Sequence, residues 1–240
     1  MTEMVEAVLN GAYRMVLPKH RADRPEWHTS EGWERARLDA MHTRIGPGDV
    51  VYYCGAELGE MPALCQMWGA DLVLFEPNPK AWPAIRKVWE ANGLTPPTSF
   101  PGFASNVTAM RGEELVTGWP RYTQQEIFEA HGFKELYLEA DNYPQVRIDD
   151  AWREFGCEPP SVISFDVEGS EWQLLRGAEE TLRQHKPTLF ASIHPEMLMH
   201  QWGEWSRDLR NWIISFGYRE TLLDYGHELH CLYSPLVTNC

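Results

Sequence analysis

Residues 163–171 read ISFDVEGSE, an apolar, β-favouring run that stops at a carboxylate and is followed by a helix-like segment. About ninety residues earlier, the stretch VLFEPNP at 73–79 has the same plan. Parallel strands that end in this way place charged side chains at the carboxyl edge of their sheet, where open α/β sheets bind small molecules. The two stretches therefore predict a small-molecule site together with the fold.

Strand-like and helix-like segments alternate around these two stretches. We expect strands at 49–54, 71–75, 98–104, 162–166 and 188–194, and helices at 58–68, 80–92, 148–155, 171–185 and 204–216. Two further β-like runs, 219–223 and 229–233, predict a terminal hairpin. Alternation of this kind indicates right-handed crossovers and a parallel sheet.

The ends of this pattern suggest the domain organisation. Residues 1–48 are expected to form an N-terminal helical cap, with an amphipathic stretch at 4–16 and a second helix capped by Thr29 or Ser30. Residues 49–240 would form the main domain, the whole chain being one compact unit. Residues 107–147 have a loose pattern, too long for a simple connection, and predict a lid or substrate loop.

Composition excludes several classes of function. The chain of 240 residues has a formal net charge of −14 and no run of Lys and Arg, so a nucleic-acid partner is not expected. Its five cysteines, without a C-x-x-C pair, indicate neither a disulfide framework nor a zinc site. No apolar run approaches the roughly 20 residues of a membrane helix, and the acidic start is unlike a secretory signal. We expect reduced, mostly buried thiols and a cytoplasmic protein with no membrane partner.

A turn and an acid together predict a nucleoside cofactor. Gly55 and Gly59 bracket the turn after the first strand, where backbone can approach a ligand. Glu76 ends the second strand, where doubly wound folds place an acid that accepts hydrogen bonds from ribose hydroxyls. The third glycine of the G-x-G-x-x-G pattern is missing, and Glu57 and Glu60 would repel a pyrophosphate. A cofactor that lacks phosphates and carries a positive charge fits better.

Asp166, Glu168 and His194 come from adjacent strand ends, and any of them could act as a general base toward a hydroxyl. His194 is the best single candidate because the ordinary pKa of histidine, about 6.5, lies near neutral pH. The same trio could hold a divalent cation that orients two hydroxyls, but no spacing signature fixes one, so no metal ligand is predicted. Structural roles stay open: the two acids could cap the helix beginning near Ser170, and His194 could be a turn residue before Pro195.

Several aromatic rings fall outside the clear core stripes. Trp33, Trp119 and Tyr122 are candidates for stacking on a sugar face, although ordinary packing is the commoner role of such rings.

In order along the chain, these motifs resemble those of the FkbM-type family of S-adenosylmethionine-dependent methyltransferases, over roughly residues 49–233. The resemblance rests on Gly55-Ala56-x-x-Gly59, FEPNP at 75–79, Ala104-Ser105-Asn106, DVEGSE at 166–171, Leu175-x-Gly177-Ala178, Lys186-Pro187 and Ile193-His194-Pro195. One departure is Tyr53, where the family usually carries an Asp. A carboxylate near the methionine part of the cofactor is therefore absent or supplied by Glu57.

The resemblance implies an α/β fold with a Rossmann-like, mostly parallel sheet of seven strands in the order 3-2-1-4-5-7-6 and helices on both faces. It also implies S-adenosylmethionine as cofactor and O-methylation of a small polyhydroxylated acceptor, plausibly a sugar or glycan. The cofactor would be bound by Gly55, Ala56, Glu57, Gly59, Glu76, Pro77, Asn78, Ala104, Ser105 and Asp166. The catalytic residues would be Asp166, Glu168 and His194, with Asp166 beginning the acceptor side.

Two other functions stay open. The same sheet architecture serves NAD-linked oxidoreductases, and Tyr53 would suit a catalytically inactive module that only binds the cofactor. The sequence does not decide between a monomer and a homo-oligomer.

Overall fold

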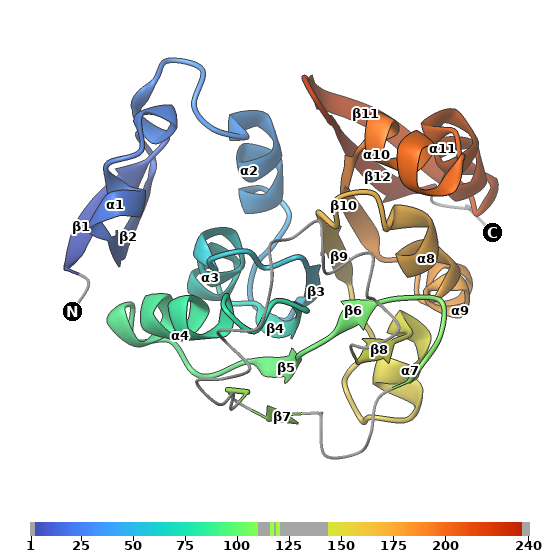
Figure 1. Ribbon diagram of the computed structural model, residues 1–240, viewed down its shortest axis with the longest axis horizontal. Helices are drawn as coiled ribbons and strands as arrows, with labels where there is room; N and C mark the ends of the chain where they lie inside the picture. Colours follow the sequence, from blue (N-terminus) through green and yellow to red (C-terminus); the bar gives the residue numbers. More distant parts are fainter. Residues whose placement is uncertain (1–2, 110–115, 118, 121–143, 237–240) are drawn as a thin grey trace.

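A mostly parallel sheet with helices on both faces forms the centre of the computed structural model, which describes residues 3–109, 116–117, 119–120 and 144–236 (Figure 1). The sheet has eight strands in the order β11-β12-β10-β9-β3-β4-β5-β7. They are β3 Val50–Cys54, β4 Asp71–Phe75, β5 Thr98–Phe100, β7 Val116–Thr117, β9 Val162–Phe165, β10 Thr188–Ile193, β11 Tyr218–Tyr225 and β12 Leu229–Pro235.

The expected strand order is present, with one addition. Counted in chain order without β7, the strands follow 3-2-1-4-5-7-6 across the sheet. Neighbours from β5 through β4, β3 and β9 to β10 are parallel, whereas β12 is antiparallel to both β10 and β11. The addition is β7, which pairs antiparallel with β5 and extends that edge.

The helices differ from the sequence expectation in a few places. They are α3 Glu60–Met67, α4 Trp82–Ala91, α7 Ile148–Arg153, α8 Glu171–Arg176, α9 Glu179–Gln184, α10 Pro195–Trp202 and α11 Ser206–Ser215. The single helix expected at 171–185 is broken at Gly177, where a Cβ would lie 1.8 Å from the carbonyl oxygen of Ser105. The strand expected at 98–104 is also divided: β6 Phe103–Ala104 leaves the main sheet to pair with β8 Gln145–Val146.

Alternation along the strands builds two hydrophobic cores, one on each face of the sheet. Val51 and Tyr53 of β3 point to the core under α3 and α4, whereas Tyr52 and Cys54 point to the core under α7 to α11. Successive side chains of a strand face opposite sides, so a strand covered on both faces must be apolar throughout, as VVYYC is.

The expected helix at 4–16 is wrong. These residues form an antiparallel hairpin of β1 Met4–Leu9 and β2 Tyr13–Pro18. Its turn contains Asn10 and Gly11 with φ angles of 51° and 72°, and Asn-Gly is the dipeptide that tight hairpin turns favour. The helical cap expected over residues 1–48 is therefore a hairpin followed by α1 Lys19–Ala22, the 3-10 turn η1 Pro25–His28 and α2 Arg35–His42.

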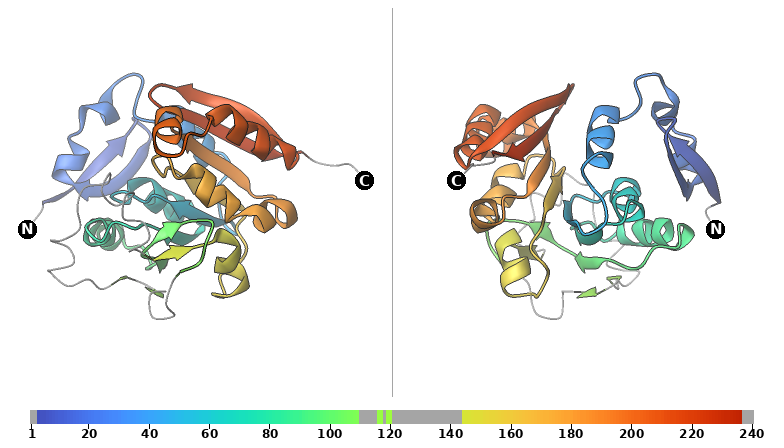
Figure 2. Two further views of the ribbon diagram at one scale, coloured as in Figure 1. Left: turned by 45° about the vertical axis from the view of Figure 1, so that its right-hand side comes forward. Right: turned by 180° about the vertical axis from the view of Figure 1, so that it is seen from behind.

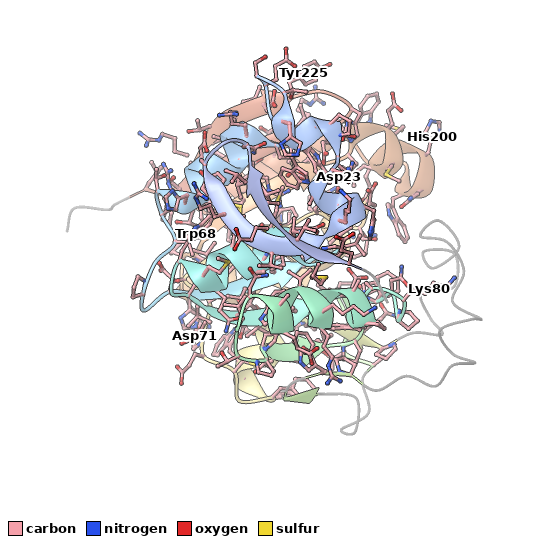
Figure 3. All side chains as sticks on the ribbon, turned by 90° about the vertical axis from the view of Figure 1, so that its left-hand side faces the viewer. Asp23, Trp68, Asp71, Lys80, His200 and Tyr225 are labelled. Carbon is pink, nitrogen blue, oxygen red and sulfur yellow. The ribbon has the colours of Figure 1, made fainter. Side chains whose placement is uncertain are left out.

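The N-terminal hairpin lies over the side of the sheet that carries α3 and α4. Its second strand is held by Asn92, whose side chain both accepts from the Val16 N–H and donates to the Val16 carbonyl, each at 2.8 Å. Figure 3 shows this segment, marked by Asp23, in front of the sheet and above α4. In Figure 1 and in the rear view of Figure 2, α2 lies between the N-terminal hairpin and the β11–β12 pair.

Other sequence expectations have mixed outcomes. Cys54, Cys65 and Cys231 are buried free thiols, and Cys157 is a half-buried one, as expected. In the described part of the chain, no helix is both long enough and apolar enough to span a bilayer. Most of the predicted loop at 107–147, including Tyr122, lies outside the described residues.

Candidate functional site

A cavity of about 520 Å³ opens where the carboxyl ends of the central strands meet the N-terminal segment. Three of the sheet's strands and the segment from α1 to α2 contribute to its wall. The lining residues are Arg21, Arg24, Trp27, Trp33, Glu34, Arg37, Tyr53, Gly55, Ala56, Glu57, Glu60, Met61, Pro62, Glu76, Asp166, Glu168, His227 and Glu228.

The turn after β3 brings the backbone close to the end of β9. Gly55 has a φ of 83°, and a Cβ on it would lie 1.9 Å from the carbonyl oxygen of Asp166. Only glycine allows this approach, because any side chain would displace one of the two strand ends. Gly55 and Asp166 therefore lie on the same wall of the cavity, as their positions at neighbouring parallel strands predict.

Glu76 directly follows β4 and is 1% exposed. Its Oε1 accepts a hydrogen bond from the Asn78 N–H at 2.8 Å, and its Oε2 accepts one from the Glu57 N–H at 3.2 Å. Burial raises the pKa of this carboxyl to about 7, although the backbone donors oppose the shift. A backbone hydrogen bond from Ala56 also lowers the pKa of Glu76. A carboxylate has about four acceptor positions, so at least one remains for a hydroxyl donor of a ligand in the cavity.

Asp166, Glu168 and His194 lie together, as predicted from the strand ends. His194 Nε2 is 3.6 Å from Asp166 Oδ1 and 3.5 Å from Glu168 Oε2. Both acids line the cavity, whereas His194 is 4% exposed and lies behind them. Ser170 precedes α8 and makes no side-chain cap hydrogen bond to that helix. The role considered for the two acids at the start of α8 stays a prediction.

His194 is held by a carboxylate that the sequence interpretation did not assign to the site. Glu171 Oε1 accepts from the His194 Nδ1–H at 2.7 Å and from its backbone N–H at 3.1 Å. Burial disfavours the imidazolium, but hydrogen bonds to Glu171 and Glu228 and the charge of Asp166 outweigh it and raise the pKa of His194 to about 11. These contacts favour the charged imidazole over the neutral one, so a role as general base would require Nε2 to lose its proton first. The assignment of His194 as the base stays a prediction.

Arg37 of α2 crosses from the N-terminal segment to the strand ends. It is 1% exposed, donates to Ser164 of β9 and Ser192 of β10 at 3.0 Å each, and pairs with Glu34 at 2.6 Å. Its guanidinium is also 3.6 Å from Asp166 Oδ2. This arginine fixes both the position of α2 and the charge beside Asp166.

Glu228 also joins the site, from the turn between β11 and β12. Its Oε2 lies 3.1 Å from His194 Nε2, and the side chain is 8% exposed. Glu171 could have been identified from its place at the end of the DVEGSE motif. Glu228, Glu34 and Arg37 carry no local signal, because only the tertiary fold brings them to the strand ends.

Some residues predicted to bind the cofactor do not line the cavity. Pro77 and Asn78 follow Glu76, and Asn78 acts through its N–H on the Glu76 carboxylate. Gly59 precedes α3, with a φ of 95°. Ala104 and Ser105 lie at the β6–β8 pair, where Ser105 Oγ donates to Gln145 at 2.8 Å.

The two tryptophans singled out from the sequence have different environments. Trp33 lines the cavity, with the guanidinium of Arg24 4.0 Å above its ring. Trp119 packs edge-on against Trp89, with ring centroids 5.8 Å apart, and is half-buried against the core.

Residues 54–220 match the family model described as the methyltransferase FkbM domain. No curated protein sequence matches the chain. The crystal structure of a methyltransferase FkbM from Methylobacillus flagellatus KT superimposes with a TM-score of 0.52 at 20% identity, covering 79% of this chain and 44% of that one. An rRNA methylase from Streptococcus thermophilus gives a TM-score of 0.49 at 9% identity, covering 83% of this chain and 94% of that one. This chain thus spans less than half of the first structure, and the likeness concerns the fold.

Proposed function

Because the chain belongs to the FkbM methyltransferase family, we propose that it transfers a methyl group from S-adenosylmethionine to a hydroxyl of a small polyhydroxylated acceptor, such as a sugar or glycan. The observation that carries this proposal is that Glu76, Asp166 and Glu168 line the same cavity. Only β3 lies between β4 and β9, so the two ends of the site are about 10 Å apart, two strand spacings. A nucleoside bound at Glu76 can therefore present its substituent to Asp166.

In this proposal the cofactor follows the strand ends. Glu76 accepts hydrogen bonds from the ribose hydroxyls, while Gly55 and Ala56 lie along the methionine part. Arg21 is a candidate partner for the methionine carboxylate: it is 7% exposed, lines the cavity, and its Nη2 has no hydrogen-bond partner within the described chain. The neighbouring Glu57, 3.6 Å from that nitrogen, is mostly exposed and is the carboxylate available for the cofactor's ammonium group.

The charge of the cavity favours a sulfonium over a phosphate. Seven acidic side chains line it, against three arginines. The acids are Glu34, Glu57, Glu60, Glu76, Asp166, Glu168 and Glu228. Negative charge attracts the S-adenosylmethionine cation and repels the pyrophosphate of NAD, so the site suits the former.

The chemical step is an in-line displacement at the methyl carbon. An acceptor oxygen held about 3 Å from that carbon attacks it, the carbon–sulfur bond breaks, and S-adenosylhomocysteine leaves as a neutral thioether. The hydroxyl proton passes to one of the two carboxylates that face the cavity, Asp166 or Glu168, and then to water. His194 is proposed to orient these acids, because Glu171 fixes its ring through Nδ1 and its Nε2 lies 3.5 to 3.6 Å from both of them.

The N-terminal segment is proposed to act as a cap rather than as a separate domain. It contributes Arg21, Trp33 and Arg37 to the cavity wall, and the Arg37 contacts join it to β9 and β10. Residues 49–240 would then bind cofactor and acceptor only together with residues 1–48.

Thermal unfolding with separate additions of S-adenosylmethionine and NAD tests the proposal, because a ligand that binds the native state raises the melting temperature. We expect S-adenosylmethionine to raise it and NAD to leave it unchanged. Incubation with a panel of sugars and other polyols, followed by mass spectrometry, should then reveal a product heavier by one methylene.

The alternatives predict other outcomes. Stabilisation by NAD alone would indicate an oxidoreductase. Binding of S-adenosylmethionine without turnover on any hydroxylated acceptor would indicate an inactive binding module. Absence of binding would refute both methyltransferase versions.

A further inference from the structure

We propose that Asp166, Glu168 and His194 bind a divalent metal ion at the wall of the cavity. The sequence left this trio open as a cation site but had no spacing signature to assign a ligand, and the proposal comes from how the side chains lie. The binding itself does not depend on the proposed function, whereas the task assigned below to the ion does.

The separations of the donor atoms suit one shared ion. A metal ion about 2.0 to 2.2 Å from each ligand places neighbouring donors roughly 3.0 to 3.6 Å apart, for angles from 90° to tetrahedral. His194 Nε2 lies 3.6 Å from Asp166 Oδ1 and 3.5 Å from Glu168 Oε2, and one donor atom of each residue lies within 4.8 Å of the others. Glu168 is 40% exposed, so its side chain can close the remaining gap between the two acids.

His194 is prepared as a ligand by its contact with Glu171. A histidine that binds metal through one ring nitrogen usually donates from the other to a carboxylate, which fixes the ring and its tautomer. Nδ1 of His194 makes this hydrogen bond, 2.7 Å long, to a Glu171 that is fully buried. Nε2 is thereby directed at the two acids, and it would give up its proton when the ion binds.

A second, independent observation comes from Glu228. This side chain is more than nine-tenths buried, and its Oε2 lies 3.1 Å from His194 Nε2, with no other partner in the part of the chain that is described. When Nε2 binds an ion it no longer carries a proton, so this buried acceptor would lose its donor, which is costly. A cation between these groups would satisfy it.

The excess of acidic side chains around His194 also favours a cation at this site. Asp166, Glu168, Glu171 and Glu228 surround His194, and the nearest permanent positive charge is Arg37, 3.6 Å from Asp166. The positive charge of the cofactor sulfonium alone would neutralise part of this negative charge. The experiment below separates that case from a metal site.

The ion would face the cavity through Asp166 and Glu168, with positions left open for ligand oxygens. If the proposed function holds, these positions suit two adjacent oxygens of the acceptor, as in a vicinal diol, and the ion would lower the pKa of the hydroxyl to be methylated. The acceptor class thereby narrows from polyhydroxylated molecules in general to those able to chelate.

The test uses the full chain after treatment with a chelator. Mn²⁺ is titrated and followed by electron paramagnetic resonance, and Mg²⁺ and Zn²⁺ are added as competitors. We expect one Mn²⁺ per chain, with binding weakened at least about tenfold in Glu168→Gln and about 10- to 100-fold in Glu171→Gln, which removes the support of His194. Glu90→Gln, the same change at an exposed position of α4, is the matched control and should bind as the parent does.

Failure of Mn²⁺ and Zn²⁺ to bind, or equal binding by Glu168→Gln and the parent, would overturn the metal site. Glu168 is the chosen position because its exposed side chain can change without disturbing the core. Calorimetry with S-adenosylmethionine on the same samples distinguishes this proposal from the proposed function. If the cofactor binds but no metal ion does, the metal site is refuted, the proposed function stands, and the acids interact with the sulfonium alone.

Discussion

Glu76→Gln gives a sharp test of where the nucleoside binds. The carboxylate already accepts backbone N–H groups of Glu57 and Asn78, one on each oxygen. In glutamine one oxygen becomes an NH₂ group, which donates and would meet one of these donors. The remaining oxygen cannot serve both a backbone N–H and two ribose hydroxyls as well as the carboxylate does.

The expected loss can be estimated from hydrogen bonding. A hydrogen bond to a charged partner contributes about 1.5 to 3 kcal/mol. Loss of one such bond from the ribose would raise the Kd for S-adenosylmethionine about 10- to 150-fold. The exposed change Glu90→Gln should leave the Kd unaltered.

Isothermal titration calorimetry of both variants measures the Kd, and thermal unfolding without ligand checks that the Glu76 variant is folded. A Kd within about threefold of the parent, in a variant with a normal melting temperature, would refute the placement of the ribose at Glu76.

Three further predictions concern stability and pH. Arg37→Met leaves Glu34 and Asp166 without their cationic partner and should lower the free energy of unfolding by about 3 to 5 kcal/mol. Urea titrations measure this loss, and replacement of an exposed arginine should lower the same free energy by less than about 1 kcal/mol. Gly55→Ala should lower the melting temperature more than Gly11→Ala does, because both glycines have positive φ but only a Cβ at position 55 would clash with the Asp166 carbonyl. Equal losses of melting temperature would mean that the turn after β3 can move to accommodate the Cβ. Because burial raises the pKa of Glu76 to about 7 and hydroxyls donate to the ionised form, cofactor affinity should fall about tenfold from pH 8 to pH 6, with a flatter profile in Glu76→Gln.

The parallel core of the fold could be predicted from local pattern. Each of β3, β4, β9 and β10 is a mostly apolar run that ends in a turn or at a charged residue, and this is the pattern of strands buried on both faces. The strand order came from the resemblance to a family. Periodicity alone does not specify which strands are neighbours.

The N-terminal error has a local cause. The stretch at 4–16 has apolar residues at helical spacing, which predicts a helix, but Asn10-Gly11 stands in its middle between alternating buried residues. The Asn-Gly turn is a stronger signal than this helical spacing, and it determines the hairpin. The hairpin then determines where Arg21 and the cavity wall can lie.

The candidate site was predictable in position and not in chemistry. Strand ends predicted that Glu76, Asp166 and His194 would share one edge. The protonation of His194 depends on Glu171, which is 23 positions away, and on Glu228 from the terminal hairpin. Such long-range contacts leave no periodic trace in the sequence.

A crystal structure of the full chain with S-adenosylhomocysteine tests the central claim most directly. The account predicts the ribose hydroxyls against the Glu76 carboxylate and the sulfur turned toward Asp166 and Glu168. A nucleoside bound outside this cavity, or a sulfur directed away from those two acids, would contradict it.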